Sequence, residues 1–286
     1  MKFAFIRDHL SEYPPAAACR ALQVGRSGYY AWRGRPLSAQ HRRRDGLAVK
    51  IQAIYQENRR AYGSPRITRE LRKSGESVCE NTVAKVMRDQ GVRAKSGKRF
   101  VPRTTDSRHD QPVAPNRLDR VFTAPAPNRR WVADITYIPT GEGWLYLAGI
   151  LDLYSRRIVG WSMADHMETS LVEEALRMAV ARTRPPAGLV HHSDRGVQYA
   201  SSEYQGLMES FAMIPSMSGK GDCYDNAPME SFWATLKTEL VHQERYQTRD
   251  EARRSIFEYI EAFYNRKRMH SSLGYVSPET FEASQN

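Results

Sequence analysis

The sequence is poor in cysteine: it has three in 286 residues, at positions 19, 79 and 223. They form no C-x-x-C pair and no disulfide framework, which is typical of a protein kept in a reducing cytosol. We also expect no zinc site in the N-terminal part, because its candidate ligands lack a usable spacing: His9, Cys19, His41 and Cys79.

Long hydrophobic runs are absent as well. No stretch approaches the roughly 18 consecutive apolar residues that span a bilayer, so we expect no contact with a membrane. Charged residues from Arg7 onward interrupt the N-terminal segment MKFAFIRDHLSEY, which argues against a signal peptide. The length fits about two domains of 100–200 residues, and 41% apolar residues suffice for a packed core.

Acidic residues are scarce in the first part of the chain. Residues 1–120 contain 26 Lys and Arg against 11 Asp and Glu, whereas residues 121–286 contain 17 against 21. The basic part is suited to binding phosphate groups, and the acidic part is suited to binding cations. A basic surface that serves only solubility is the alternative.

The first 120 residues predict two helical units that bind DNA. Residues 14–34 favour two short helices around a Gly-containing turn, a helix-turn-helix pattern that other helical hairpins share. Residues 36–45 read as a basic linker whose Arg42, Arg43 and Arg44 either bind phosphates or form a solvated tether.

The second helical unit follows at 46–90, with expected helices at Gly46–Asn58, Pro65–Ser74 and Glu80–Gln90. The last helix carries polar side chains suited to the major groove: Asn81, Thr82, Lys85 and Arg88. Residues 91–128 are polar, contain Pro and lack periodicity, so they predict a linker that separates the binding arm from a catalytic body.

From residue 129 the pattern changes to strands, and the expected fold class is α/β. Three strands in a meander, then alternating helices and strands, predict a mixed five-stranded sheet flanked by helices. The expected strands are 130–139, 144–153, 157–163, 189–192 and 213–216, and the expected helices are 170–182, 202–211, 227–240 and 250–265. A basic, polar tail follows.

Three carboxylates occupy positions that favour a catalytic site. Asp134 lies within an apolar strand, Asp194 follows a buried strand, and Glu230 lies in the first turn of a helix opened by Asn226 and Pro228. An Asp in such a strand is disfavoured unless it is paired or bound to metal. Each residue also has a structural explanation: a buried ion pair, a turn cap at Gly196, or a favourable helix dipole.

Five motifs carry a resemblance that covers essentially the whole chain: WVADITYI at 131–138, LDLYSRRIVGW at 151–161, HSDRGVQYAS at 192–201, GDCYDNAPMESFWATLKTEL at 221–240 and YNRKRMHSSLGYVSPETF at 264–281. The chain resembles the large-frame transposases of bacterial insertion sequences, whose catalytic domain is similar to retroviral integrase. The resemblance implies an RNase H-like fold and a catalytic Asp-Asp-Glu triad at Asp134, Asp194 and Glu230.

Such a triad suits two Mg²⁺ ions, with Mn²⁺ as a substitute, since both prefer carboxylate and water oxygens. Asp134 is expected to bridge the two ions, while Asp194 and Glu230 bind one each. The ions activate first a water and then a DNA 3′-hydroxyl for in-line attack on a phosphate, without a covalent protein intermediate.

Further DNA contacts are expected around the triad. Lys237 lies two helical turns after Glu230 on the same face, and similarity to integrases suggests that it contacts the DNA at the element's end; an exposed lysine without that role is the alternative. Lys220 lies in a loop, 217–226, that is expected to act as a mobile flap. The basic tail offers Arg266, Lys267, Arg268 and His270 to phosphates.

The predicted function is that of a DNA transposase in the bacterial cytosol and nucleoid. It is expected to bind double-stranded element ends and target DNA as a homo-oligomer, with an upstream helix-turn-helix protein of the same element as a further partner. A structure-specific nuclease on the same fold and an inactive DNA-binding regulator are the alternatives. The expected divisions are 1–45, 46–95, 96–128 (linker), 129–240 (catalytic core) and 241–286.

Overall fold

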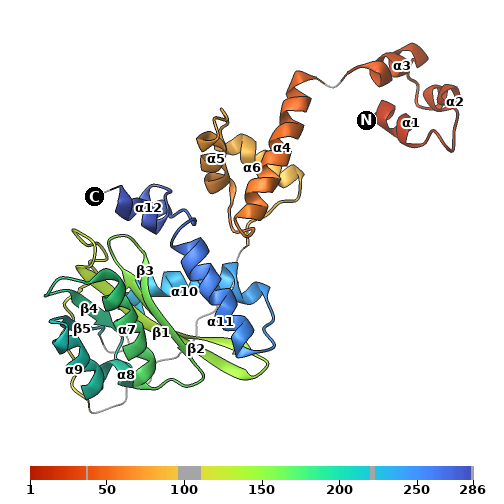
Figure 1. The fold of residues 1–286 in the computed structure, drawn as a ribbon. Helices are drawn as coiled ribbons and strands as arrows, with labels where there is room; N and C mark the ends of the chain where they lie inside the picture. The colour runs from red at the N-terminus through yellow and green to blue at the C-terminus, as the bar shows by residue number, and fades with distance from the viewer. Residues whose placement is uncertain (37, 96–110, 220–222, 285–286) are drawn as a thin grey trace.

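The computed structural model describes residues 1–36, 38–95, 111–219 and 223–284. Figure 1 shows three parts in chain order: a small group of N-terminal helices, a helical module, and a core built on one β-sheet. The sheet and its covering helices confirm the predicted α/β class.

The N-terminal helices are α1 (Lys2–Asp8), α2 (Pro15–Ala21) and α3 (Arg26–Gly34). They enclose a small core of Ile6, Cys19 and Tyr29. The two expected short helices are therefore present as α2 and α3. The helix α1, which precedes them, was not expected.

The helical module contains α4 (Ala39–Glu57), α5 (Ser64–Lys73) and α6 (Glu80–Asp89), which pack on one another. The predicted linker at 36–45 is wrong from residue 39 onward, because α4 already begins at Ala39. The hydroxyl of Ser38 accepts a hydrogen bond from the backbone N–H of His41 and caps this helix. Arg42, Arg43 and Arg44 therefore lie on a helix.

The core sheet has the strand order β3-β2-β1-β4-β5. Its strands are β1 (Arg130–Thr140), β2 (Gly143–Asp152), β3 (Ile158–Ala164), β4 (Val190–Ser193) and β5 (Ile214–Met217). β1, β2 and β3 form an antiparallel meander, whereas β4 and β5 are parallel to β1. The predicted mixed five-stranded sheet is confirmed.

Helices cover both faces of this sheet (Figure 1). One face packs on α7 (Thr169–Thr183) and α9 (Ser202–Ser210), with the short α8 (Val197–Ala200) beside them. The other face packs on α10 (Ala227–Glu239) and α11 (Arg249–Glu258). β1 alternates between the two, since Trp131 and Ala133 face α7 and α9 while Val132 faces α10.

The C-terminal segment differs from the predicted single helix and exposed tail. α11 ends at Glu258 and continues as a turn of π-helix, η3 (Tyr259–Tyr264). Short helices η2 (Val241–Gln243) and η4 (Ser271–Leu273) and a last helix α12 (Pro278–Ala283) complete the chain. The basic tail is partly buried because Met269 and Leu273 pack into the core.

The helical module is in contact with the core, although the sequence predicted a linker separating them. The hydroxyl of Tyr62 lies 3.1 Å from the carbonyl oxygen of Lys267 and 2.9 Å from the backbone N–H of Met269. Lys95 donates a hydrogen bond of 2.7 Å to the carbonyl of Glu239 at the end of α10. One continuous hydrophobic cluster runs through both parts.

Candidate active site

Two of the predicted carboxylates meet because of the register between β1 and β4. These strands are parallel, and Val132 pairs with His192. Asp134 lies two residues after Val132, and Asp194 lies two residues after His192. The two aspartates are therefore at the same level on adjacent backbone segments, where paired strands lie about 4.8 Å apart. The register therefore places side by side two residues that are 60 positions apart in the sequence.

The third carboxylate, Glu230, comes from α10, which crosses β1 and β2. The helix is fixed at its start, where the amide of Asn226 donates a 3.0 Å hydrogen bond to the carbonyl of Ala133, next to Asp134. One turn after Glu230, the indole N–H of Trp233 donates a 3.0 Å hydrogen bond to Oδ2 of Asp134.

A glycine allows this contact. Gly149 is the β2 partner of Asp134, and a Cβ at this position would lie 2.8 Å from Cη2 of Trp233. Any larger residue would therefore push the indole away from the sheet. We name the group of Asp134, Asp194, Glu230 and Trp233 the carboxylate site.

The carboxylate site combines burial with repulsion between acidic groups. Burial, followed by repulsion from Asp194, raises the pKa of Asp134 to about 8, with a smaller contribution from Glu230. Partial burial also raises the pKa of Glu230. Lys237 is attracted to Asp134, yet burial lowers its own pKa, and its Nζ lies 5.0 Å from the centre of the Tyr137 ring.

Two buried polar atoms near the site have no hydrogen-bond partner within the described part of the chain. They are the hydroxyl of Tyr199 and Oδ1 of Asn226. Tyr199 interacts electrostatically with both Asp134 and Asp194, which contribute after burial to a raised pKa of its phenol. A buried polar group without a partner is costly, so these atoms are suited to water held at the site.

The donor set fits a hard divalent cation. Carboxylate oxygens are the preferred ligands of Mg²⁺, and a cation would remove the repulsion that raises the pKa of Asp134. Among the residues that the structure describes, no group of three or more His, Cys, Asp or Glu side chains is arranged to hold a metal ion by itself. Mg²⁺ commonly retains several waters, so a site of this kind needs few protein ligands.

The two histidines before Asp194 are structural. His191 lies 3.0 Å from the hydroxyl of Tyr204, and His192 lies within 3.1 Å of the hydroxyls of Ser216 and Ser218. Burial lowers the pKa of both imidazoles to about 4, so they are neutral at pH 7. They position the end of β4.

Sequence reasoning missed Tyr199, Asn226 and Trp233 as parts of the site, and it also missed Asp225. The Asp225 carboxylate accepts hydrogen bonds from the backbone N–H of Gly219 and from the side chains of Asn116 and Arg120. It thereby connects the loop before α10 to the segment before β1. The i, i+3 spacing of Glu230 and Trp233 was the signal for the indole.

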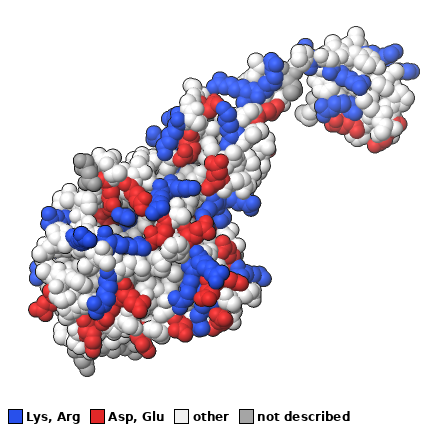
Figure 2. All heavy atoms as spheres, viewed as in Figure 1, with Lys and Arg blue, Asp and Glu red and all other residues white. Residues whose placement is uncertain are grey.

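The predicted DNA contacts have different environments. Asn81, Thr82, Lys85 and Arg88 form one exposed side of α6, as expected for a recognition helix. Arg42 is exposed, Arg43 donates to the carbonyl of Ser77, and Arg44 forms an ion pair with Asp89. Lys220 lies outside the described residues. Figure 2 shows Lys and Arg along the helical module and the N-terminal helices, with both charges mixed over the core.

Arg268 is the prediction that the structure contradicts. Its guanidinium is buried and binds the carboxylate of Glu239 through three hydrogen bonds of 2.7–3.1 Å. Tyr259 donates to the same carboxylate at 2.7 Å. A charged tail of this sequence predicted an exposed surface, but the segment folds back and Glu239 supplies a buried partner.

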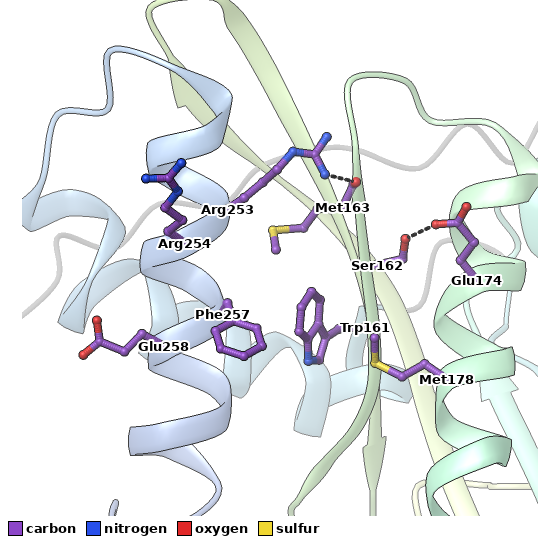
Figure 3. Close-up of a pocket in the computed structure, with 9 residues that line it drawn as sticks. All are labelled: Trp161, Ser162, Met163, Glu174, Met178, Arg253, Arg254, Phe257 and Glu258. Carbon is purple, nitrogen blue, oxygen red and sulfur yellow. Dashed lines mark hydrogen bonds between the residues drawn. The ribbon is translucent and has the colours of Figure 1, made fainter.

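A larger pocket of about 650 Å³ lies away from the carboxylate site, between α11, β3 and α7 (Figure 3). Trp161, Met163, Met178 and Phe257 form its apolar wall, and Arg253 donates to the carbonyl of Met163. It contains none of the three predicted catalytic residues. The predicted catalytic carboxylates lie elsewhere, in the middle of β1, just after β4 and in the first turn of α10.

Comparison with known proteins identifies the family of the chain. Models described as "Integrase core domain" match residues 124–223 and 230–285, and a model described as "HTH-like domain" matches residues 42–100. The transposase InsF for insertion sequence IS3A of Escherichia coli (strain K12) is 43% identical over 284 residues, covering 99% of this chain and 98% of that protein. The chain belongs to this family of insertion-sequence transposases. The transposase is therefore an enzyme, a polynucleotidyl transferase with an integrase core, and it acts on DNA.

The comparisons also find two further similar proteins. An "Insertion element IS600 uncharacterized 31 kDa protein" of Shigella sonnei is 46% identical over 263 residues, covering 92% of the transposase and 96% of that protein. A solved structure titled as the HTLV-2 integrase catalytic core domain in complex with magnesium matches 55% of the transposase and 98% of that chain, with 16% identity and a TM-score of 0.43.

In the described ranges of the transposase, no helix is long and apolar enough to cross a membrane.

Proposed function

We propose that this transposase binds the ends of its insertion sequence and catalyses Mg²⁺-dependent DNA cleavage followed by strand transfer. The observation that carries the proposal is the acidic cluster at Asp134. Three carboxylates, from β1, the end of β4 and α10, lie near one another there, and repulsion from Asp194 and Glu230 adds to burial in raising the pKa of Asp134. A cluster of buried carboxylates with a raised pKa is typical of a site that binds a cation or stabilises charge that develops during a reaction.

The three carboxylates have separate roles in this proposal. Asp134 is the central ligand, because it interacts with both of the others, while Asp194 and Glu230 each serve one of two ions. When bound, Mg²⁺ lowers the pKa of the attacking hydroxyl and stabilises the leaving oxygen. Trp233 fixes the orientation of the Asp134 carboxylate through its hydrogen bond, and the backbone N–H of Ile135 holds the other oxygen at 2.8 Å.

The helical parts supply DNA recognition. α5 and α6 form a helix-turn-helix, and the exposed side chains of Asn81, Lys85 and Arg88 on α6 face outward for contacts in the major groove. The attraction of Lys237 to Asp134 supports a role for this lysine in contacting a phosphate next to the one that reacts. Joining two ends requires at least two protomers, so we propose a homo-oligomer on DNA.

An end-joining assay tests the proposal. Duplex DNA that carries the terminal sequence of the element is incubated with wild-type protein, with Glu230→Gln and with Glu209→Gln, in Mg²⁺, in Mn²⁺ and in EDTA. We expect cleaved and joined product only where the metal and Glu230 are both present. Glu209 is exposed on α9, which covers the opposite face of the sheet from α10, so its variant controls for the loss of one negative charge away from the carboxylate site.

Two outcomes contradict the proposal. Metal-dependent cleavage without any joined product would identify a nuclease, and specific DNA binding without any cleavage would identify an inactive regulator.

A further inference from the structure

A second site lies on the opposite side of α10 from the carboxylate site. It is a cavity of about 340 Å³ between α5, α10, the end of β2 and the segment 264–272. Polar atoms make up most of its lining, which includes Arg66, Arg156, Arg268, His270, Ser231 and Thr235. We name it the arginine pocket.

The positive charge of the arginine pocket exceeds its negative charge. Arg268 is neutralised by Glu239, as described above. Arg66 donates only to the carbonyl of Met269 at 3.0 Å, and Arg156 only to the carbonyl of Phe122 at 2.8 Å. Within the part of the chain that the structure describes, no carboxylate lies within 4.0 Å of either guanidinium.

The two arginines are also partly removed from solvent. Burial lowers the pKa of both guanidinium groups, and repulsion from Arg268 lowers that of Arg66 further; the more distant carboxylates of Glu239 and Asp152 offset this only in part. Burial followed by Arg268, Arg66 and Arg156 lowers the pKa of His270 to about 3, which makes this imidazole neutral. Holding two half-buried cations beside a third costs free energy unless an anion compensates them.

The geometry of α10 relates this pocket to the chemistry. Ser231 and Thr235 line the arginine pocket, whereas Glu230, Trp233 and Lys237 lie on the opposite face of the same helix, about 10 Å away across its diameter. The pocket also joins two parts of the protein, because Arg66 belongs to α5 of the helical module and Arg156 to the core.

We propose that the arginine pocket binds a phosphate group of the DNA backbone and thereby fastens the helical module to the core when DNA is bound. A planar guanidinium group can bind two oxygens of one phosphate at the same time through two parallel N–H donors. The hydroxyls of Ser231 and Thr235 are additional donors. The proposal rests on the membership of a DNA-acting family, and it is independent of the roles assigned to the carboxylate site.

The first test measures DNA binding in EDTA, so that no reaction takes place. Affinity for the terminal duplex is measured between about 50 and 200 mM salt for wild type, Arg156→Gln and the matched control Arg177→Gln. Arg177 is exposed on α7, which covers the opposite face of the sheet, and it lies 3.8 Å from Glu173. We expect Arg156→Gln to weaken binding about tenfold and to reduce the slope of log affinity against log salt by about 0.9, the value of one phosphate contact.

A second variant separates loss of binding from loss of folding. Thr235→Glu places a carboxylate inside the arginine pocket, where it compensates Arg66 and Arg156. We expect it to raise the melting temperature of the free protein while it weakens DNA binding to the same extent as Arg156→Gln. A change that merely damages the fold would lower the melting temperature.

Inorganic phosphate distinguishes the two sources of the anion. We expect it to raise the melting temperature of wild type and Arg177→Gln by a few degrees relative to equal ionic strength of chloride, and to leave both pocket variants unchanged. If phosphate stabilises wild type but the salt slopes of the pocket variants equal that of wild type, the site takes a small anion and the DNA assignment is refuted. If phosphate has no effect and the slopes are equal, the pocket binds no phosphate at all.

Discussion

Replacing Asp134 by Asn should inactivate the transposase and at the same time stabilise the metal-free protein. The pKa of Asp134 is about 8 in the folded chain and about 3.9 in an unfolded one. The folded state therefore holds a proton that the unfolded state releases. Stability from this group is fully present below about pH 4 and is lost as the pH rises towards 8.

The size of the effect follows from the same two pKa values. One pKa unit corresponds to about 1.4 kcal/mol, so the ionisable group lowers the free energy of unfolding by up to about 4 kcal/mol at pH 7. Asn avoids this cost. Its amide N–H₂ must, however, face one of the two donors at this position, the indole of Trp233 or the N–H of Ile135, which costs roughly 1–3 kcal/mol.

We therefore expect Asp134→Asn to be about 1–3 kcal/mol more stable than wild type in EDTA at pH 7–8, and to lose this advantage near pH 5. Urea unfolding at several pH values measures the difference. Mg²⁺ should stabilise wild type more at pH 8 than at pH 6, because binding must displace the proton, and should not stabilise the variant.

Asp225→Asn is the matched control. Burial acts to raise the pKa of Asp225, but hydrogen bonds from Gly219 and Arg120 and the charge of Arg120 lower it overall. This carboxylate contributes stability above its unfolded pKa and loses it as the pH falls, so its Asn variant should be less stable than wild type at pH 7. If both Asn variants destabilise the metal-free protein equally, the electrostatic account of the carboxylate site is refuted.

Four other substitutions test individual contacts in the core. Trp233→Phe removes the N–H donor to the central carboxylate and should weaken the apparent Mg²⁺ affinity, measured from the rate of cleavage against Mg²⁺ concentration, roughly tenfold or more with little loss of secondary structure. Gly149→Ala should lower the free energy of unfolding by about 1–3 kcal/mol and reduce activity, because its Cβ would lie 2.8 Å from the indole of Trp233. Its control is Gly206→Ala on the exposed side of α9, where no atom lies within 4 Å of the new Cβ, and this variant should be more stable by roughly 0.5–1 kcal/mol. Glu239→Gln leaves the buried Arg268 without its counter-charge and should cost about 3 kcal/mol in urea unfolding, and a cost below about 1 kcal/mol would show that the pair is solvated.

Local patterns in the sequence were sufficient for most of the core. Alternating apolar residues predict β1, β2 and β3 to within a residue or two, because these strands alternate between two covered faces of a sheet. The π-helical end of α11 and the first turns of α4 were not predicted. Such boundaries depend on tertiary contacts, and local propensity does not determine them.

The site was predictable in part. The three carboxylates stood out because each is unusual in its own element and because the surrounding motifs resemble those of a known family. Tyr199, Trp233 and Gly149 were missed, since an aromatic side chain or a glycine in a strand is ordinary until the neighbouring helix is placed against it.

The sequence alone determined the class of fold, the family and the three acidic residues, since apolar periodicity and short motifs are properties of neighbouring positions in the chain. The tertiary structure decided which charges are compensated. It buried Arg268 against Glu239, left Arg66 and Arg156 without a carboxylate, and placed Asp134 level with Asp194. Electrostatic energy depends on distance and burial, and both are set only when segments that are distant in sequence pack together.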